Sequence, residues 1–244
     1  VREKIGVVLE DGGFPSTMSA AQVSTLLARA YKNWNAEQFA SYIEKFGIDR
    51  EKAIKDYSKG MKTKLNIAAA LSHDAELLLL DEPLSNLDAR LRLEMREEIL
   101  RIQQRTGVTT IFVTHDQEEA LSMSDTVVVM NNGIIQQIGS PEDIYNEPEN
   151  RFVANFIGDS NIIEGNMIRD CLVCFDGIEF PCVDKGFKDN EEVEVVLRPE
   201  DIDIVEPDKS KLKGKVASIV FKGVHYEIIV RTDRRDYKIH TTDY

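Results

Sequence analysis

Leu77-Leu78-Leu79-Leu80-Asp81-Glu82-Pro83 is a continuous apolar run that ends in two acids. Such a run is typical of a parallel β-strand that is covered on both faces. In α/β proteins, ligands and chemistry are found at the carboxyl ends of parallel strands. The stretch therefore predicts a central parallel strand that presents Asp81 and Glu82 at the functional edge of its sheet.

A second apolar run lies downstream and also ends in polar residues. The residues from Asp88 to Gln104 have the pattern of a capped amphipathic helix, and Thr109 to Thr114, after Gly107, predict a strand. His115 and Asp116 follow this strand directly. We therefore expect His115 at the end of a parallel strand that neighbours the first.

The alternation of helices and strands extends on both sides of this pair. Lys4 to Leu9 predicts a buried strand, and a helix is expected from near Ser58 to Leu71. Helical periodicity over residues 20–46, broken near Asn33, predicts a helical insertion. The elements expected further downstream are a short helix at residues 118–122, a strand at residues 126–130 and a hairpin turn at Asn131-Asn132-Gly133. The first part thus reads as an α/β domain with a helical subdomain at about residues 15–75.

From about Ser160 the pattern changes to short β-branched and aromatic runs separated by Gly, Pro and Asp. The clearest runs are Glu192 to Leu197, Lys215 to Phe221 and Tyr226 to Arg231. They predict a separate, small all-β domain, with Pro141 to Gly158 as the connection. We expect domains at residues 1–158 and 159–244, the second incomplete because the chain stops just after a strand-like segment.

Composition limits the function classes. The 244 residues carry a formal net charge of -13, which argues against a nucleic-acid binder that neutralises phosphates. No apolar stretch approaches the roughly 20 residues needed to cross a bilayer. The chain does not begin with Met and starts at once with a buried strand, so we expect it to begin inside a domain.

The three cysteines, Cys171, Cys174 and Cys182, are clustered. An odd number without a secretory signal fits reduced, half-buried thiols better than a disulfide framework. A zinc site is the alternative, but it would need a fourth ligand, and His225 lies far away in the sequence without the paired spacing of structural zinc sites.

Four motifs in one order resemble the ATP-binding-cassette (ABC) ATPases. They are Tyr57-Ser58-Lys59-Gly60-Met61-Lys62, Leu77 to Pro83, Ser85-Asn86-Leu87-Asp88 and Thr114-His115-Asp116. Each alone is weak, because adjacent acids or a lone histidine are usually structural, but the ordered series makes coincidence improbable. The resemblance implies an α/β fold in which part of a RecA-like P-loop NTPase sheet precedes a small OB-like β domain, termed TOBE.

The resemblance also implies roles for individual residues, with ATP and Mg²⁺ as cofactors. Asp81 would hold Mg²⁺ through water, and Glu82 would be the catalytic base. His115 would be the switch histidine that contacts the γ-phosphate. Ser58, Lys59 and Gly60 would bind the nucleotide of the opposite subunit at a helix N-terminus, and Asp88 would lie at the dimer seam.

Several positions depart from the family pattern. Lys59 replaces the first of two glycines, Met61 replaces a glutamine, and Glu10 stands where the family has the glutamine of the Q-loop. A carboxylate at Glu10 could still bind Mg²⁺ but could not donate hydrogen bonds as an amide does. No G-x-x-x-x-G-K-[ST] motif occurs, so we expect these residues alone to be inactive.

The resemblance differs along the chain, which leaves the type of transporter open. Residues 1 to about 80 look like exporter ATPases for drugs and peptides, while Leu84 to Arg92 and Gly139 to Gly158 look like importer ATPases. The tail, with Leu197 to Asp201 and Phe221 to Tyr226, resembles the accessory domain of spermidine/putrescine importers. A natural mosaic, an assembled sequence and a divergent importer are all compatible with this pattern.

We favour the importer, because an added β domain after the ATPase core is an importer trait of the family. The alternatives are a drug or peptide exporter and a non-catalytic interaction fragment. The importer assignment implies a dimer with a second ATPase subunit and transmembrane permease subunits. It also implies an extracytoplasmic substrate-binding protein that acts through the permease, no nucleic acid, and a peripheral position on the cytoplasmic face of the membrane.

Overall fold

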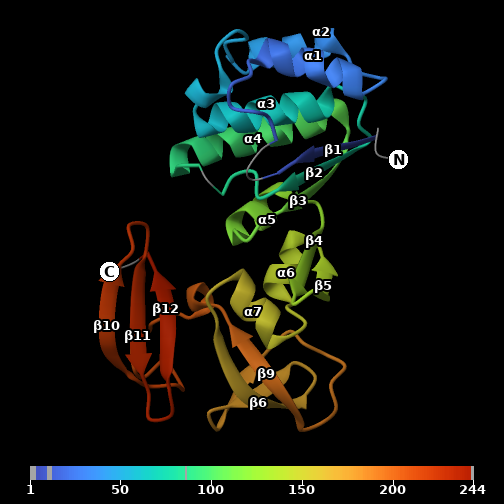
Figure 1. Ribbon diagram of the computed structural model, residues 1–244. Coiled ribbons are helices and arrows are strands. Elements are labelled where there is room, and N and C mark those ends of the chain that lie inside the picture. The colour runs from blue at the N-terminus through green and yellow to red at the C-terminus, as the bar shows by residue number, and fades with distance from the viewer. Residues whose placement is uncertain (1–3, 10–12, 86, 243–244) are drawn as a thin grey trace. The chain divides into compact units, whose positions relative to one another are not determined.

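The computed structural model of the protein describes residues 4–9, 13–85 and 87–242 (Figure 1). Two compact units make up the chain, Val1–Asp125 and Thr126–Tyr244. Among the described residues, every helix is too short or too polar to cross a bilayer. The domain boundary expected between residues 158 and 159 stays a prediction, because a compact unit is not the same thing as a family domain.

The first unit contains a three-stranded parallel sheet in the order β1-β2-β3. Its strands are β1 (Ile5–Val8), β2 (Leu77–Asp81) and β3 (Thr109–Val113). Leu80 of β2 lies opposite Val8 on one side and Phe112 on the other. The prediction of a central parallel strand that ends in Asp81 is therefore confirmed.

The helices of this unit begin and end at residues that the sequence marks. They are α1 (Ala20–Ala30), α2 (Ala36–Lys45), η2 (Ile54–Asp56), α3 (Lys59–Leu71), α4 (Ala89–Thr106) and α5 (Gln117–Met123). Asn35 caps α2 and Ser58 caps α3, so the predicted break near Asn33 and the predicted start near Ser58 are confirmed. Gly107 ends α4 in the left-handed conformation that favours glycine.

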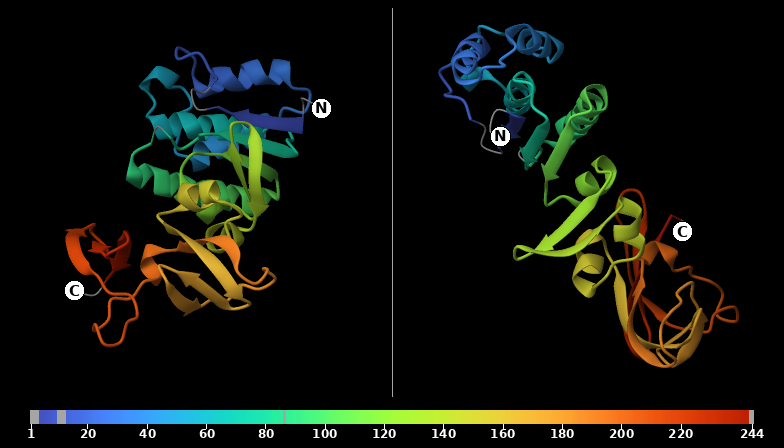
Figure 2. Two further views of the ribbon diagram at one scale, coloured as in Figure 1. Left: turned by 90° about the horizontal axis from the view of Figure 1, so that it is seen from below. Right: turned by 90° about the vertical axis from the view of Figure 1, so that its right-hand side faces the viewer.

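The sheet is covered on one face by α3 and α4, which lie along it side by side (Figures 1 and 2). Leu78 and Leu80 point into this core and are buried there with Ile67 of α3 and Ile99 of α4. The expectation that the sheet is covered on both faces is wrong for the described residues. On the other face Val7, Ile111 and Val113 are exposed, because no described element of this unit packs over them.

The second unit begins with the predicted hairpin. Strands β4 (Val127–Asn131) and β5 (Ile134–Gly139) pair through the Asn132-Gly133 turn, in which both residues have positive φ. Two helices follow where the sequence suggested only a connection: α6 (Pro141–Asn146) and α7 (Arg151–Ile157). Both are amphipathic, since Ile144, Val153 and Ile157 are buried.

Two antiparallel sheets complete the second unit, and their strands are drawn in orange and red in Figure 1. The first sheet has the order β8-β7-β6-β9 and contains β6 (Asn161–Arg169), β7 (Leu172–Phe175), β8 (Ile178–Pro181) and β9 (Glu191–Leu197). The short helix η3 (Pro199–Asp201) leads to the second sheet of β10 (Lys215–Phe221), β11 (Tyr226–Arg231) and β12 (Asp236–Thr241). Tyr237 of β12 shares a buried cluster with Ile163 and Phe175, so the two sheets have a common core. The all-β character predicted for this region is confirmed.

The three cysteines are free and half-buried, as the sequence predicted. Cys171 follows β6, Cys174 lies in β7 and Cys182 follows β8. Cys182 lies 3.9 Å from the sulfur of Met167, a contact typical of thiols that pack as small apolar groups.

Candidate functional site

The turn after β2 holds Glu82 in an unusual backbone conformation. Its φ is 44°, in the left-handed region that costs a non-glycine residue about 1–2 kcal/mol. The Glu82 N–H donates to the carbonyl of Val113 at 2.9 Å, and its carbonyl accepts from Ser85 Oγ at 2.9 Å. Leu84 is fully buried and anchors the turn in the core. Backbone strain held in place by its surroundings is a mark of functional sites.

Glu82 and His115 lie together at the carboxyl edge of the sheet. His115 Nδ1 is 3.2 Å from Glu82 Oε1, although the His115 side chain is 71% exposed. Asp81, the last residue of β2, is partly buried and pairs with Val113 of β3. The predicted placement of these three residues is confirmed, because the ends of two adjacent parallel strands bring them to one edge. Their catalytic roles stay predictions.

Ser58 caps the N-terminus of α3, close to where the helix was expected to begin. Ser58 Oγ accepts from the N–H of Met61 at 3.2 Å, and both Ser58 and Lys59 are exposed. Gly60 is buried against α4, where a Cβ would lie 2.7 Å from Cδ2 of Leu91. Close packing of two helices therefore gives a structural reason for this glycine, beside the nucleotide-binding role that stays a prediction.

Asp88 caps α4, and its Oδ1 accepts from the N–H of Leu91 at 2.9 Å. Its side chain is exposed, so this carboxylate remains accessible beyond its role as a cap. Glu10, the candidate Q-loop residue, lies outside the described residues. The structure thus brings Asp81, Glu82 and His115 together and places Ser58, Lys59, Gly60 and Asp88 at the starts of two helices.

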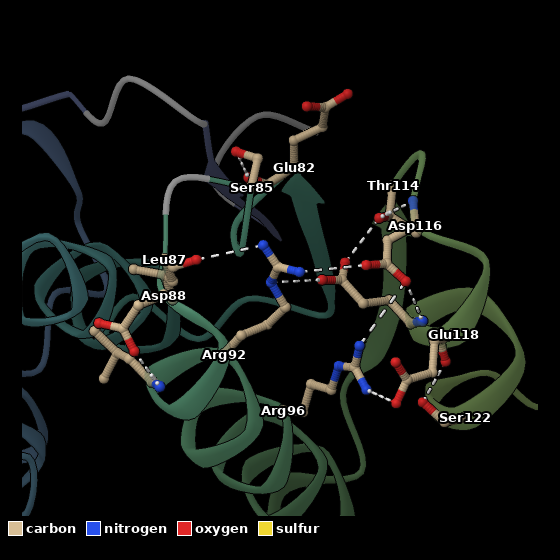
Figure 3. Close-up of polar contacts among 12 residues, drawn as sticks. Glu82, Ser85, Leu87, Asp88, Arg92, Arg96, Thr114, Asp116, Glu118 and Ser122 are labelled. Carbon is tan, nitrogen blue, oxygen red and sulfur yellow. Dashed lines mark hydrogen bonds and ion pairs between the residues drawn. The ribbon is translucent and has the colours of Figure 1, made fainter. Parts of the chain in front are cut away.

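Arg92, which was not among the predicted site residues, joins two loops of the site. Arg92 Nη2 donates to the carbonyl of Leu87 at 3.3 Å, and its Nη1 donates to Asp116 Oδ2 at 3.5 Å (Figure 3). Its Nε also lies 3.7 Å from Glu119 Oε1. Arg92 therefore links the loop before α4 to the loop that follows His115, whereas the side chain of Glu82 points away from it.

The carboxylates that face Arg92 are themselves held in place. Glu119 is only 4% exposed, and its Oε2 accepts from Thr114 Oγ1 at 2.7 Å. Arg96 is buried and donates to Glu118 Oε1 at 2.9 Å. This hydrogen bond raises the pKa of Arg96, so the guanidinium stays charged. The signal for this cluster was present in the sequence, because Arg92 and Arg96 are four residues apart and share one face of α4.

The donor groups at the sheet edge define what the site can hold. Two carboxylates supply the oxygen ligands that Mg²⁺ prefers, and Mg²⁺ in nucleotide sites takes one or two carboxylates together with substrate phosphates. Asp81 and Glu82 fit that requirement, and an imidazole beside them can donate a hydrogen bond to an anion. The arrangement suits a metal-bound phosphate chain and an attacking water.

Comparison with known proteins agrees with this arrangement. The family model for the ABC transporter matches residues 1–85, and the model for the TOBE domain matches residues 195–238. The spermidine/putrescine import ATP-binding protein PotA of Aster yellows witches'-broom phytoplasma (strain AYWB) is 52% identical over 233 residues, which cover 95% of this chain and 56% of that protein. PotA of Desulfitobacterium hafniense (strain Y51) is 58% identical over 189 residues, 78% of this chain and 54% of that protein.

A solved structure shows the same fold. The protein cbiO1 from Clostridium perfringens, described as part of the ABC transporter complex cbiONQ, is 28% identical and has a TM-score of 0.53 over 61% of each chain. The present chain spans a little over half the length of the curated relatives that it matches. With its acid-ended parallel strand, its neighbouring histidine and its β tail, the chain carries an ABC transporter domain at residues 1–85 and a TOBE domain at residues 195–238, and it is similar to the PotA proteins over most of its length.

Proposed function

We propose that this chain supplies the catalytic base and the phosphate-contacting histidine of an ATP-hydrolysing subunit that powers the import of spermidine and putrescine. The observation that carries the proposal is the 3.2 Å contact of Glu82 with His115 at the ends of two adjacent parallel strands. It occurs in a chain that is 52% identical, over 95% of its length, to a protein named for polyamine import.

In this proposal Glu82 polarises the water that attacks the γ-phosphate and accepts its proton. The strained turn suits this task, because hydrogen bonds to both backbone polar groups of Glu82 fix the carboxylate at the sheet edge. His115 donates a hydrogen bond to the γ-phosphate, and its exposed ring is accessible to a nucleotide. Asp81 would hold Mg²⁺, which would supply positive charge beside the phosphates.

The proposed active unit is a dimer of ATPase subunits. Ser58, Lys59 and Gly60 lie at the start of the 13-residue helix α3, where free N–H groups favour an anion, here a phosphate of the opposite subunit's ATP. Asp88, exposed at the start of α4, lies at the seam. Further partners are the permease subunits and, through them, an extracytoplasmic substrate-binding protein. The subunit sits peripherally on the cytoplasmic face of the membrane.

The comparisons support an importer over an exporter. One polyamine-import relative aligns over 95% of the chain, so the likeness includes most of residues 1–80, where the motifs resemble those of exporters. The TOBE match at residues 195–238 points the same way, because this added domain is an importer trait.

Uptake of labelled spermidine and putrescine tests the proposal, in cells that carry the complete transporter operon. We expect uptake to fall to the level of a strain without this subunit when Glu82→Gln is introduced. Glu94→Gln is the matched control, because Glu94 is exposed on α4 and pairs only with Arg90 among the described residues. Unchanged polyamine uptake after deletion of the subunit, together with lost resistance to a peptide antibiotic, would instead identify an exporter.

A further inference from the structure

A mixed cluster of one imidazole and two carboxylates lies in the second unit, on elements that the ATP site does not use. We call Asp159, Glu227 and His240 the TOBE-unit triad. Glu227 of β11 and His240 of β12 are direct partners across two antiparallel strands, and Asp159 comes just before β6. One possible ligand atom from each of the three lies within 4.8 Å of the others.

His240 gives the strongest indication that the triad binds something. Its side chain is 18% exposed, yet its Nε2 is fully buried and has no hydrogen-bond partner among the described residues. This atom lies 4.0 Å from Asp159 Oδ2. A buried polar atom without a partner costs about 1–3 kcal/mol, so a group that binds Nε2 would recover that energy.

The surroundings of His240 hold its ring in place. His240 Nδ1 lies 3.9 Å from Glu200 Oε2, and the ring packs on that of His225 with 4.3 Å between centroids. A carboxylate near the second nitrogen of a metal-binding histidine typically fixes the tautomer and the orientation of the ring. Here that arrangement leaves Nε2 turned toward Asp159.

We propose that the TOBE-unit triad binds a divalent transition-metal ion of the Zn²⁺ class. One imidazole nitrogen and two carboxylate oxygens suit Zn²⁺, with water completing the coordination. Mg²⁺ and Ca²⁺ fit less well, because these hard cations prefer oxygen ligands alone. None of the three residues belongs to the proposed ATP site, so evidence against one proposal would leave the other unaffected.

Two lysines form ion pairs with the carboxylates of the triad. Lys238 Nζ lies 3.0 Å from Asp159 Oδ2, and Lys222 Nζ lies 3.7 Å from Glu227 Oε1. Both lysine side chains keep part of their surface in water, so they can turn away when an ion takes their place. The metal must compete with these ammonium groups, and removing Lys238 should therefore strengthen metal binding.

The main rival for Zn²⁺ in this unit is the cysteine cluster. Cys171, Cys174 and Cys182 lie on or next to three consecutive strands, and thiolates are good zinc ligands. A test of the triad must therefore separate imidazole and carboxylate ligands from sulfur.

The experiment is calorimetric titration of the chain with Zn²⁺ in excess Mg²⁺, without nucleotide and in the presence of a reductant. We expect one saturable Zn²⁺ ion for each chain. His240→Ala and Asp159→Asn should each weaken binding about ten-fold or more, while Lys238→Gln should tighten it. Asp159→Asn keeps the test valid if His240→Ala fails to fold, because the Asp159 side chain is 53% exposed.

The matched control is the variant in which all three cysteines are replaced by serine, which should bind Zn²⁺ as the wild type does. Co²⁺ gives an independent readout, because the loaded chain should show d–d absorption without thiolate-to-metal charge transfer. Absence of saturable binding would overturn the proposal. So would binding that survives Asp159→Asn and His240→Ala, or binding that disappears in the serine variant.

Discussion

Replacing Arg92 by methionine should lower the free energy of unfolding of the first unit, because it removes the hydrogen bonds and the ion pair of the guanidinium. The Arg92 guanidinium bonds to the carbonyl of Leu87 and to Asp116, and it is the closest positive charge to the buried Glu119 carboxylate. Removing one partner of a fully buried ion pair costs about 3–5 kcal/mol. Since the Arg92 side chain is 31% exposed, we discount this to about 2–3 kcal/mol.

Urea unfolding followed by tryptophan fluorescence measures this loss, because Trp34 is the only tryptophan and packs against the core of the first unit. Arg90→Met is the matched control. Arg90 is exposed and pairs with Glu94 on the helix surface, so its loss should cost less than about 0.5 kcal/mol.

A double variant tests whether the loss of stability in Arg92→Met comes from leaving the buried Glu119 carboxylate without its ion-pair partner. Adding Glu119→Gln to Arg92→Met removes the unpaired buried charge, so the double variant should be about 1–2 kcal/mol more stable than the sum of the single losses predicts. A loss below about 0.5 kcal/mol for Arg92→Met would refute the reasoning. Strict additivity in the double variant would refute the role of Glu119.

Three further predictions concern packing, a buried guanidinium and pH. Gly6→Ala should cost about 1–3 kcal/mol in urea unfolding, because a Cβ would lie 2.6 Å from a backbone oxygen of α3, whereas Val7→Ala on the exposed face should cost less. Arg198→Ala should destabilise the second unit by about 2–4 kcal/mol in thermal or urea unfolding followed by circular dichroism, because the buried guanidinium donates to Tyr145 O and Ser160 Oγ at 2.6 Å and to Ala154 O at 3.1 Å, and all of these hydrogen bonds would be lost. Burial, followed by a hydrogen bond to Glu200, raises the pKa of Tyr145 from 10.0 to about 12. The folded state therefore favours the neutral phenol, so the free energy of unfolding should fall as the pH rises from 10 toward about 12, and Tyr145→Phe should lessen this dependence in alkaline unfolding curves.

Local patterns were enough to predict the sheet edge. The leucine run of β2 and the apolar run of β3 each specify a strand by themselves, and parallel pairing then brings Glu82 close to His115. The caps Ser58 and Asp88 were also readable, because a short polar side chain at a helix start acts within three residues.

Other features needed the tertiary structure. The bonds of Arg92 to Asp116 span 24 residues, and the left-handed backbone of Glu82 depends on a bond to the neighbouring strand. The helices α6 and α7 are a different case. Ser140 forms a capping box with Asp143 and is followed by a proline, and both are sequence signals for a helix start. The helix was not predicted because its six residues are too few to show helical periodicity.

The central claim is that Glu82 and His115 carry out ATP hydrolysis, and the rate of phosphate release by the purified complete transporter tests it most directly. Glu82→Gln should lower the rate by about 10²-fold or more while ATP stays bound, because the variant loses the base and keeps the shape of the site. His115→Ala should lower the rate by about 10²-fold through loss of one transition-state donor. Glu94→Gln should leave the rate unchanged. Wild-type turnover in either site variant would contradict the account.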